Sequence, residues 1–159
     1  MIDTIYIDMD GVIADFSKRY KEKFHVTPEE TRNNKEFNSY FDKFISDGEF
    51  STLDLMPDAT ELLNFVSELD TPKEILSSTA RPQNHGMIAP QKQMWLNKHN
   101  IHYKANFVPG KSLKYKYATS NSIIIDDTQS VIDDWNKAGG IGILHTDAIS
   151  TIAILKMYL

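Results

Sequence analysis

Short apolar runs alternate along the chain with longer segments whose apolar residues recur at helical spacing. Short runs rich in β-branched residues predict buried strands, and they fall at residues 3–8, 74–79, 105–109, 122–126 and 141–145. Segments with apolar residues three or four positions apart predict helices, and they fall at 58–69, 87–99 and 128–138. Strands that alternate with helices predict an α/β fold with a parallel sheet and right-handed crossovers.

The first crossover differs from the others, because the long segment 15–65 follows the first predicted strand. It is rich in aromatic residues and is interrupted by Pro28 and by the polar stretch 31–36. We expect this segment to form a small, mostly helical cap, with residues 1–14 and 66–159 forming the α/β core. Most of the aromatic side chains should pack between helices, while one or two face a cleft and stack on a flat substrate.

The first predicted strand ends in two acidic residues, Asp8 and Asp10, and then Gly11. Side chains alternate along a strand, so both carboxylates would share a face, and like charges that close repel. Such a pair points to a cation between the acids, or to one acid as nucleophile and the other as proton donor. Gly11 would let the backbone turn tightly and approach a ligand. The alternative is a polar turn, in which Asp and Gly are common.

A second acidic pair, Asp126 and Asp127, follows the apolar run 122–125. The carboxyl ends of parallel strands meet at one edge of a sheet, so these acids should approach Asp8. Adjacent strand residues point to opposite faces, so one of the two acids should ligate a metal directly while the other supports it; we take Asp126 as the ligand and Asp127 as the supporting residue. Hard carboxylate oxygens from two strands suit Mg²⁺. The alternative is that Asp127 or Thr128 caps the helix that follows.

The end of the predicted strand 74–79 carries groups suited to phosphate. The hydroxyls of Ser78 and Thr79 can hold phosphoryl oxygens without adding charge, and Arg81 can contact phosphate in a bidentate manner. Taken alone, hydroxyls here are also typical of an ordinary polar loop.

Three lysines precede Asp126, and a site that combines several carboxylates with a phosphate needs a nearby cation. We expect Lys114 to enter the site, with Lys111 as second choice and Lys116 as the third candidate.

Composition narrows the class of protein. The formal net charge of −5 argues against an extended nucleic-acid surface, although a local basic pocket can still hold a small phosphorylated substrate. No cysteine occurs, which rules out disulfides and thiolate metal sites and fits a cytoplasmic location. No apolar run is long enough to span a membrane, and we expect no secretory signal. The oligomeric state is left open.

The order of these motifs along the chain resembles that of the haloacid dehalogenase superfamily of phosphotransferases. The motifs are the acidic pair that begins at Asp8, the hydroxyl of Ser78, the lysines 111–116 and the acidic pair that begins at Asp126. The run from Asp8 to Phe16, and the segment from Gly48 to Pro57, are similar more narrowly to the 5′(3′)-deoxyribonucleotidases.

This resemblance implies a Rossmann-like core and Mg²⁺-dependent hydrolysis of nucleoside monophosphates through an aspartyl-phosphate. Asp8 would be the nucleophile and Asp10 the acid and base, with Mg²⁺ held by Asp8, the Asp10 backbone carbonyl and Asp126. Ser78 and Lys114 would stabilise the transferred phosphoryl group.

For the substrate, the resemblance makes Phe16 and Phe50 candidates for contact with a nucleobase. The chain departs from the nucleotidases at Arg81, because these tend to show Thr-Ser-Pro after the second strand. An arginine there looks more like phosphatases for other esters, so a polynucleotide 3′-phosphate or a small sugar phosphate is the alternative substrate. An inactive nucleotide-binding scaffold is the alternative to an enzyme.

Overall fold

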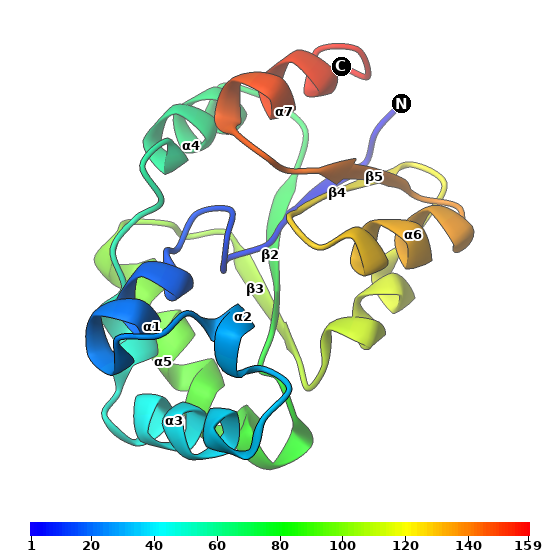
Figure 1. Ribbon diagram of the computed structural model, residues 1–159. Coiled ribbons are helices and arrows are strands. Elements are labelled where there is room, and N and C mark those ends of the chain that lie inside the picture. Colours follow the sequence, from blue (N-terminus) through cyan, green and yellow to red (C-terminus); the bar gives the residue numbers. More distant parts are fainter.

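The computed structural model describes residues 1–159 and contains one five-stranded parallel sheet (Figure 1). The strands are β1 (Thr4–Ile7), β2 (Lys73–Ser78), β3 (Lys104–Val108), β4 (Ser122–Asp126) and β5 (Ile141–Leu144), in the order β3-β2-β1-β4-β5. The predicted α/β fold is confirmed. The order reverses between β1 and β4, and ligands of such sheets bind at the carboxyl ends beside this reversal.

Helices cover both faces of the sheet. Helices α4 (Ala59–Ser67), α5 (His85–Lys98) and α7 (Ala148–Leu155) pack on one face, and α6 (Gln129–Lys137) with the 3₁₀ helix η3 (Lys111–Tyr117) packs on the other. Because β4 is buried on both faces, it reads as a continuous apolar run. None of the helices combines the length and the apolar character needed to cross a membrane.

Between β1 and β2 the chain forms α1 (Phe16–Phe24), α2 (Pro28–Thr31), α3 (Lys35–Ser46) and the 3₁₀ helix η1 (Glu49–Ser51). Their aromatic rings pack together with centroid distances from 4.6 to 6.5 Å, so most of them hold this unit together. Figure 1 shows α1, α2 and α3 below the sheet, with α5 behind them. The division into a cap of 15–65 and a core of 1–14 and 66–159 stays a prediction; α4, which crosses the second boundary, packs against α7.

Candidate active site

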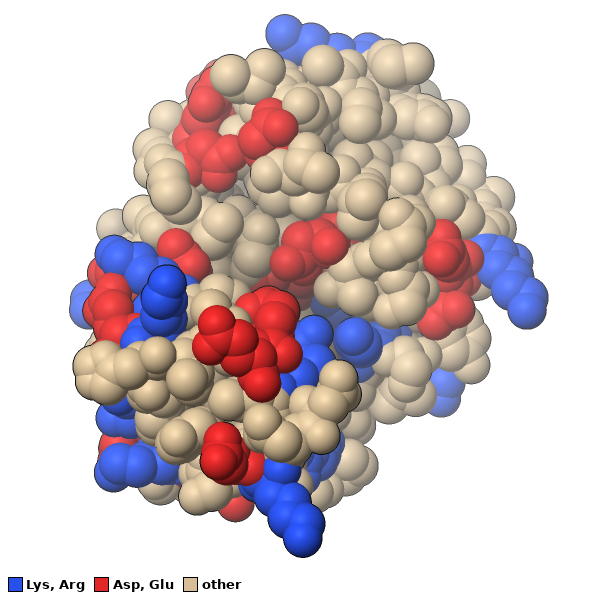
Figure 2. All heavy atoms as spheres, in the orientation of Figure 1, with Lys and Arg blue, Asp and Glu red and all other residues tan.

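A cleft of about 400 Å³ lies between the carboxyl ends of the central strands and the helices of the inserted segment. Acidic side chains form its floor, and the aromatic rings of Phe16, Phe37, Phe41 and Phe50 contribute to its wall. In Figure 2, red acidic atoms and blue basic atoms meet in the hollow between the two lobes of the molecule. The cleft therefore joins opposite charges to an apolar surface.

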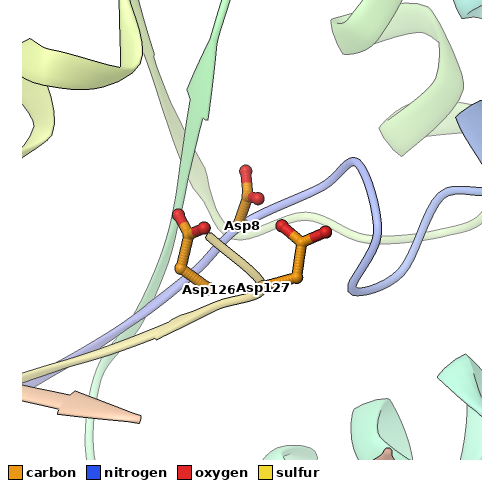
Figure 3. Close-up of side chains that lie close together, drawn as sticks. All are labelled: Asp8, Asp126 and Asp127. Atoms are coloured by element: carbon orange, nitrogen blue, oxygen red, sulfur yellow. The ribbon is translucent and has the colours of Figure 1, made fainter. Parts of the chain in front are cut away.

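Three carboxylates meet at the floor, those of Asp8, Asp126 and Asp127 (Figure 3). One oxygen of each lies within 4.8 Å of the others. The parallel register pairs Ile7 with Ile125, and so places Asp8 beside Asp126.

Asp127 joins this cluster because the chain leaves the strand after Asp126, where Thr128 N donates to Asp126 Oδ1 at 3.0 Å. Strand alternation no longer applies beyond that bend, so the side chain of Asp127 lies with those of Asp8 and Asp126 rather than on the opposite face.

Lys114 is the lysine that reaches the acids. It is buried in η3, and its Nζ donates to Asp8 Oδ1 at 2.9 Å and to Asp126 Oδ2 at 2.7 Å. Burial alone would lower the pKa of Lys114, but attraction to Asp8 and Asp126 outweighs it and raises that pKa above its ordinary value. Lys114 is therefore a fixed positive charge. Lys111 is exposed and lines the cleft, and Lys116 is exposed outside it.

The cluster holds more negative charge than Lys114 balances. Burial, with the charge of Asp8, raises the pKa of Asp126 to about 6 and that of Asp127 to about 7. A divalent cation between these oxygens would relieve the crowding, and an all-oxygen donor set suits a hard cation such as Mg²⁺. The residues present thus fit the metal expected from the sequence.

Gly11 allows Asp127 to reach this position. Its backbone adopts φ = +82°, and a Cβ built there would lie 2.0 Å from Asp127 Oδ2. The carboxyl end of Asp127 therefore packs on the Gly11 backbone, although the residue as a whole is exposed. Both the left-handed conformation and the close approach require glycine.

We expect Gly11→Ala to lower the free energy of unfolding by about 1–3 kcal/mol, because it combines a left-handed backbone with a clash. Urea denaturation measures this loss. The matched control is Gly86→Ala, since Gly86 has nothing within 4 Å of its virtual Cβ and lies in α5, where alanine is favoured. Equal stability of the two variants would contradict the close approach of Asp127.

Asp10 does not join the acidic cluster through its side chain. Its Oδ2 accepts a hydrogen bond from Lys92 Nζ at 2.9 Å, and its Oδ1 is buried without a partner. Lys92 also donates to Ser77 Oγ at 2.7 Å and to Ser78 O at 2.9 Å. The patterns at the strand ends do not predict Lys92.

A signal for Lys92 existed in the helical spacing of α5. Ile88, Lys92, Trp95 and Leu96 are its buried residues, and they lie three or four positions apart, so the lysine falls within the buried stripe.

The end of β2 offers fewer free hydroxyl groups for binding phosphate than the sequence predicts. Ser78 lines the cleft, and its Oγ accepts from Ala80 N at 3.0 Å. Thr79 is fully buried: its N–H donates to Val108 O at 2.8 Å, and its hydroxyl lies 3.2 Å from the same oxygen and 2.8 Å from His85 Nδ1. Both residues line the cleft, but the hydroxyl of Thr79 is engaged by Val108 O and His85 and offers no free donor to a substrate.

Arg81 lies at the rim of the cleft and donates a hydrogen bond to Asn38 Oδ1 of α3. This contact links the loop after β2 to the inserted helices.

Phe16 and Phe50 lie side by side in the cleft wall. Their rings are stacked, with centroids 5.6 Å apart and an interplanar angle of 2°, and Phe50 is buried. The structure thus brings both candidate base-contact residues into the cleft that the acids also line.

No curated protein sequence matches this chain. In structure it is similar to a hydrolase from Streptococcus pneumoniae TIGR4, with 16% identity and a TM-score of 0.59 over 98% of both chains. A HAD-superfamily hydrolase from Ehrlichia chaffeensis has 12% identity and a TM-score of 0.56 over 99% of this chain and 98% of its own. The HAD-hydrolase YfnB from Bacillus subtilis has 13% identity and a TM-score of 0.54, covering 89% of this chain and 85% of its own. These likenesses show a shared fold.

The family model described as 5′ nucleotidase, deoxy (pyrimidine), cytosolic type C protein matches residues 1–151. Its match spans both acidic pairs, Ser78, Lys92 and Lys114. The chain therefore belongs to this nucleotidase family of the haloacid dehalogenase superfamily, and it is a phosphatase.

Proposed function

We propose that this phosphatase hydrolyses deoxynucleoside monophosphates in a Mg²⁺-dependent reaction through a phosphoryl group carried by Asp8. The observation that carries this proposal is the position of Asp8, which shares Lys114 with Asp126 on the floor of a cleft walled by stacked aromatic rings. The substrate is a small phosphorylated molecule. A cytoplasmic location fits the family's description as cytosolic.

The metal fits the acidic cluster of the cleft floor. Asp8, Asp126 and Asp127 would hold it, and the resemblance to the haloacid dehalogenase superfamily adds the Asp10 backbone carbonyl as a further oxygen donor. When bound, the cation offsets the repulsion between the carboxylates and the incoming phosphate. The likeness to YfnB, which was crystallised bound to magnesium, supports this choice of ion.

The chain's own residues perform the two chemical steps. In the first, an Asp8 oxygen forms a bond to phosphorus while the bond from phosphorus to the leaving oxygen breaks, and Asp10 gives that oxygen a proton. In the second, Asp10 takes a proton from the water that attacks phosphorus, which frees Asp8 and releases inorganic phosphate. Lys114 and Ser78 stabilise the charge on the phosphoryl oxygens.

The aromatic wall supports a substrate with a flat base. Phe16 and Phe50 line the same cleft as Asp8, and a base packed against them would contribute about 1–3 kcal/mol to binding. Arg32, Arg81 and Lys111 also line the cleft. These additional cations favour, as a second candidate, an ester with another anionic group, such as a polynucleotide 3′-phosphate.

A substrate panel tests the proposal. We expect deoxynucleoside 5′-monophosphates to be hydrolysed with a kcat/KM at least about tenfold above that of sugar phosphates, since base stacking contributes about 1.4 kcal/mol or more. Phe16→Ala should remove most of this preference and leave hydrolysis of a small aryl phosphate within about threefold. Faster release of phosphate from 3′-phosphorylated oligonucleotides would instead favour the second candidate.

Metal binding should be visible in stability as well as in activity. The pKa of Asp127 is about 7 against an ordinary 3.8, so ionisation of Asp127 costs stability, and the cost grows as the pH rises from 3.8 to 7. In EDTA we expect Asp127→Asn to be more stable than the wild type above pH 7, and equally stable near pH 4. The expected gain in the free energy of unfolding is only about 1 kcal/mol, because solvent screens the charge of this exposed residue.

Thermal unfolding at both pH values measures the difference between Asp127→Asn and the wild type. Added Mg²⁺ should raise the Tm of the wild type more than that of the variant. A stability difference that does not change with pH would contradict the crowding of the three carboxylates.

A further inference from the structure

Lys92 stands out among the buried groups of the molecule because packing alone does not explain it. Its side chain is only 2% exposed, in the middle of α5, and lysine is almost never fully buried unless it is paired. All three of its ammonium protons have acceptors: Asp10 Oδ2, Ser77 Oγ and Ser78 O. The ammonium therefore forms a saturated connection between α5, the end of β2 and the loop after β1.

Two of these contacts need nothing but structure to explain them. The hydrogen bonds to Ser77 Oγ and Ser78 O connect α5 to β2. A serine hydroxyl and a main-chain carbonyl are ordinary acceptors for a lysine that connects two elements. The third bond is different, because it goes to a carboxylate whose side chain is 32% exposed and lines the cleft. The ion pair balances the buried charge of Lys92, and it also fixes one oxygen of a carboxylate that lines the cleft.

The bond to Lys92 leaves the Asp10 carboxylate with one oxygen held and the other free. Oδ2 accepts from the ammonium, while Oδ1 is buried and has no partner in the protein. Oδ1 is therefore the oxygen of Asp10 that no donor of the protein engages. A carboxyl group held in this way presents a single oxygen for proton transfer.

We propose that Lys92 is a positioning residue that orients the Asp10 carboxyl group for proton transfer to the leaving oxygen. The inference rests on the proposed function. As the Asp8–phosphorus bond forms and the bond to the leaving oxygen breaks, that oxygen takes the electron pair of the broken bond and the proton from Asp10 Oδ1. Lys92 keeps its own proton and touches no reacting atom.

Two substrates with different leaving groups distinguish a positioning role of Lys92 from a purely structural one. An alkyl phosphate expels a basic alkoxide and needs the proton, whereas 2,4-dinitrophenyl phosphate expels a stable phenolate and does not. For Lys92→Met we expect kcat/KM to fall about 100-fold for the alkyl ester that the wild type hydrolyses fastest, and less than about threefold for the aryl ester. The ratio kcat/KM reports the step in which Asp8 is phosphorylated.

Ser77→Ala is the matched control. It removes a contact that fastens α5 to β2 and leaves the bond from Lys92 to Asp10 in place. We expect this variant to lower kcat/KM for both esters by the same factor, which should be below about threefold. Lys92→Gln, which keeps a donor for Asp10 without the charge, should show the same selective loss as Lys92→Met to a smaller extent.

If Lys92→Met lowers kcat/KM equally for the two esters, the positioning role is overturned and the proposed function stays intact. Unfolding of both Lys92 variants, seen by circular dichroism, would also overturn it, because it is the behaviour of a structural lysine. A wild-type protein that hydrolyses neither ester would instead overturn the proposed function, and the role of Lys92 with it.

Discussion

We expect Asp8→Asn to abolish turnover, with a fall in kcat of at least about 10⁴-fold, because an amide cannot replace the carboxylate as nucleophile. The fold should survive, since the Asn side-chain oxygen can still accept from Lys114 and one of three crowded charges is removed. Steady-state hydrolysis of a deoxynucleoside monophosphate and of an aryl phosphate measures the loss, and a thermal unfolding curve checks the fold.

The control for this variant is Asp133→Asn, an exposed carboxylate on α6, which should keep wild-type turnover. Because an activated leaving group does not rescue a missing nucleophile, Asp8→Asn should be inactive on both esters. Activity within about tenfold of the wild type on either ester would show that phosphoryl transfer does not pass through Asp8.

Lys114→Met should damage both stability and catalysis. The change leaves the buried carboxylates of Asp8 and Asp126 without their shared cation, and breaking a buried ion pair from one side costs about 3–5 kcal/mol. Loss of a charge that stabilises the transferred phosphoryl group should lower kcat by about 10²–10³-fold. Urea denaturation in EDTA and steady-state kinetics measure the two effects.

Lys116→Met provides the comparison, because Lys116 lies on the same 3₁₀ helix and is exposed. Its stability should stay within about 0.5 kcal/mol of the wild type. Adding Asp126→Asn to Lys114→Met should restore part of the lost stability, since one of the unpaired buried charges disappears. If Lys114→Met is as stable as Lys116→Met, the cation does not balance the acids.

The parts of the site that lie at strand ends could be predicted from the sequence. Apolar runs locate β1, β2 and β4, and the residues directly after or at their ends must then meet at one edge of a parallel sheet. Asp8, Ser78 and Asp126 follow from that rule. Lys114 required a further step, the need of an acidic site for a cation, and the structure places it between Asp8 and Asp126.

The remaining features depend on contacts that a local pattern does not contain. Lys92 lies on the buried face of α5, but hydrophobicity alone does not mark that face, because Met87 and Met94 of the same helix are exposed. The position of Asp127 depends on the bend after β4 and on the space above Gly11. The burial of Thr79 depends on its pairing with Val108 of the neighbouring strand.

The most direct measurement is the detection of a phosphoryl group on Asp8 itself. Asp10→Asn incubated with 2,4-dinitrophenyl phosphate can still be phosphorylated, because this leaving group needs no proton, but it lacks the base for the second step. Acid quenching followed by peptide mass spectrometry should find one phosphoryl group on the peptide that contains Asp8, and none in Asp8→Asn. Release of phosphate at the wild-type rate with no phosphorylated peptide would contradict the covalent mechanism.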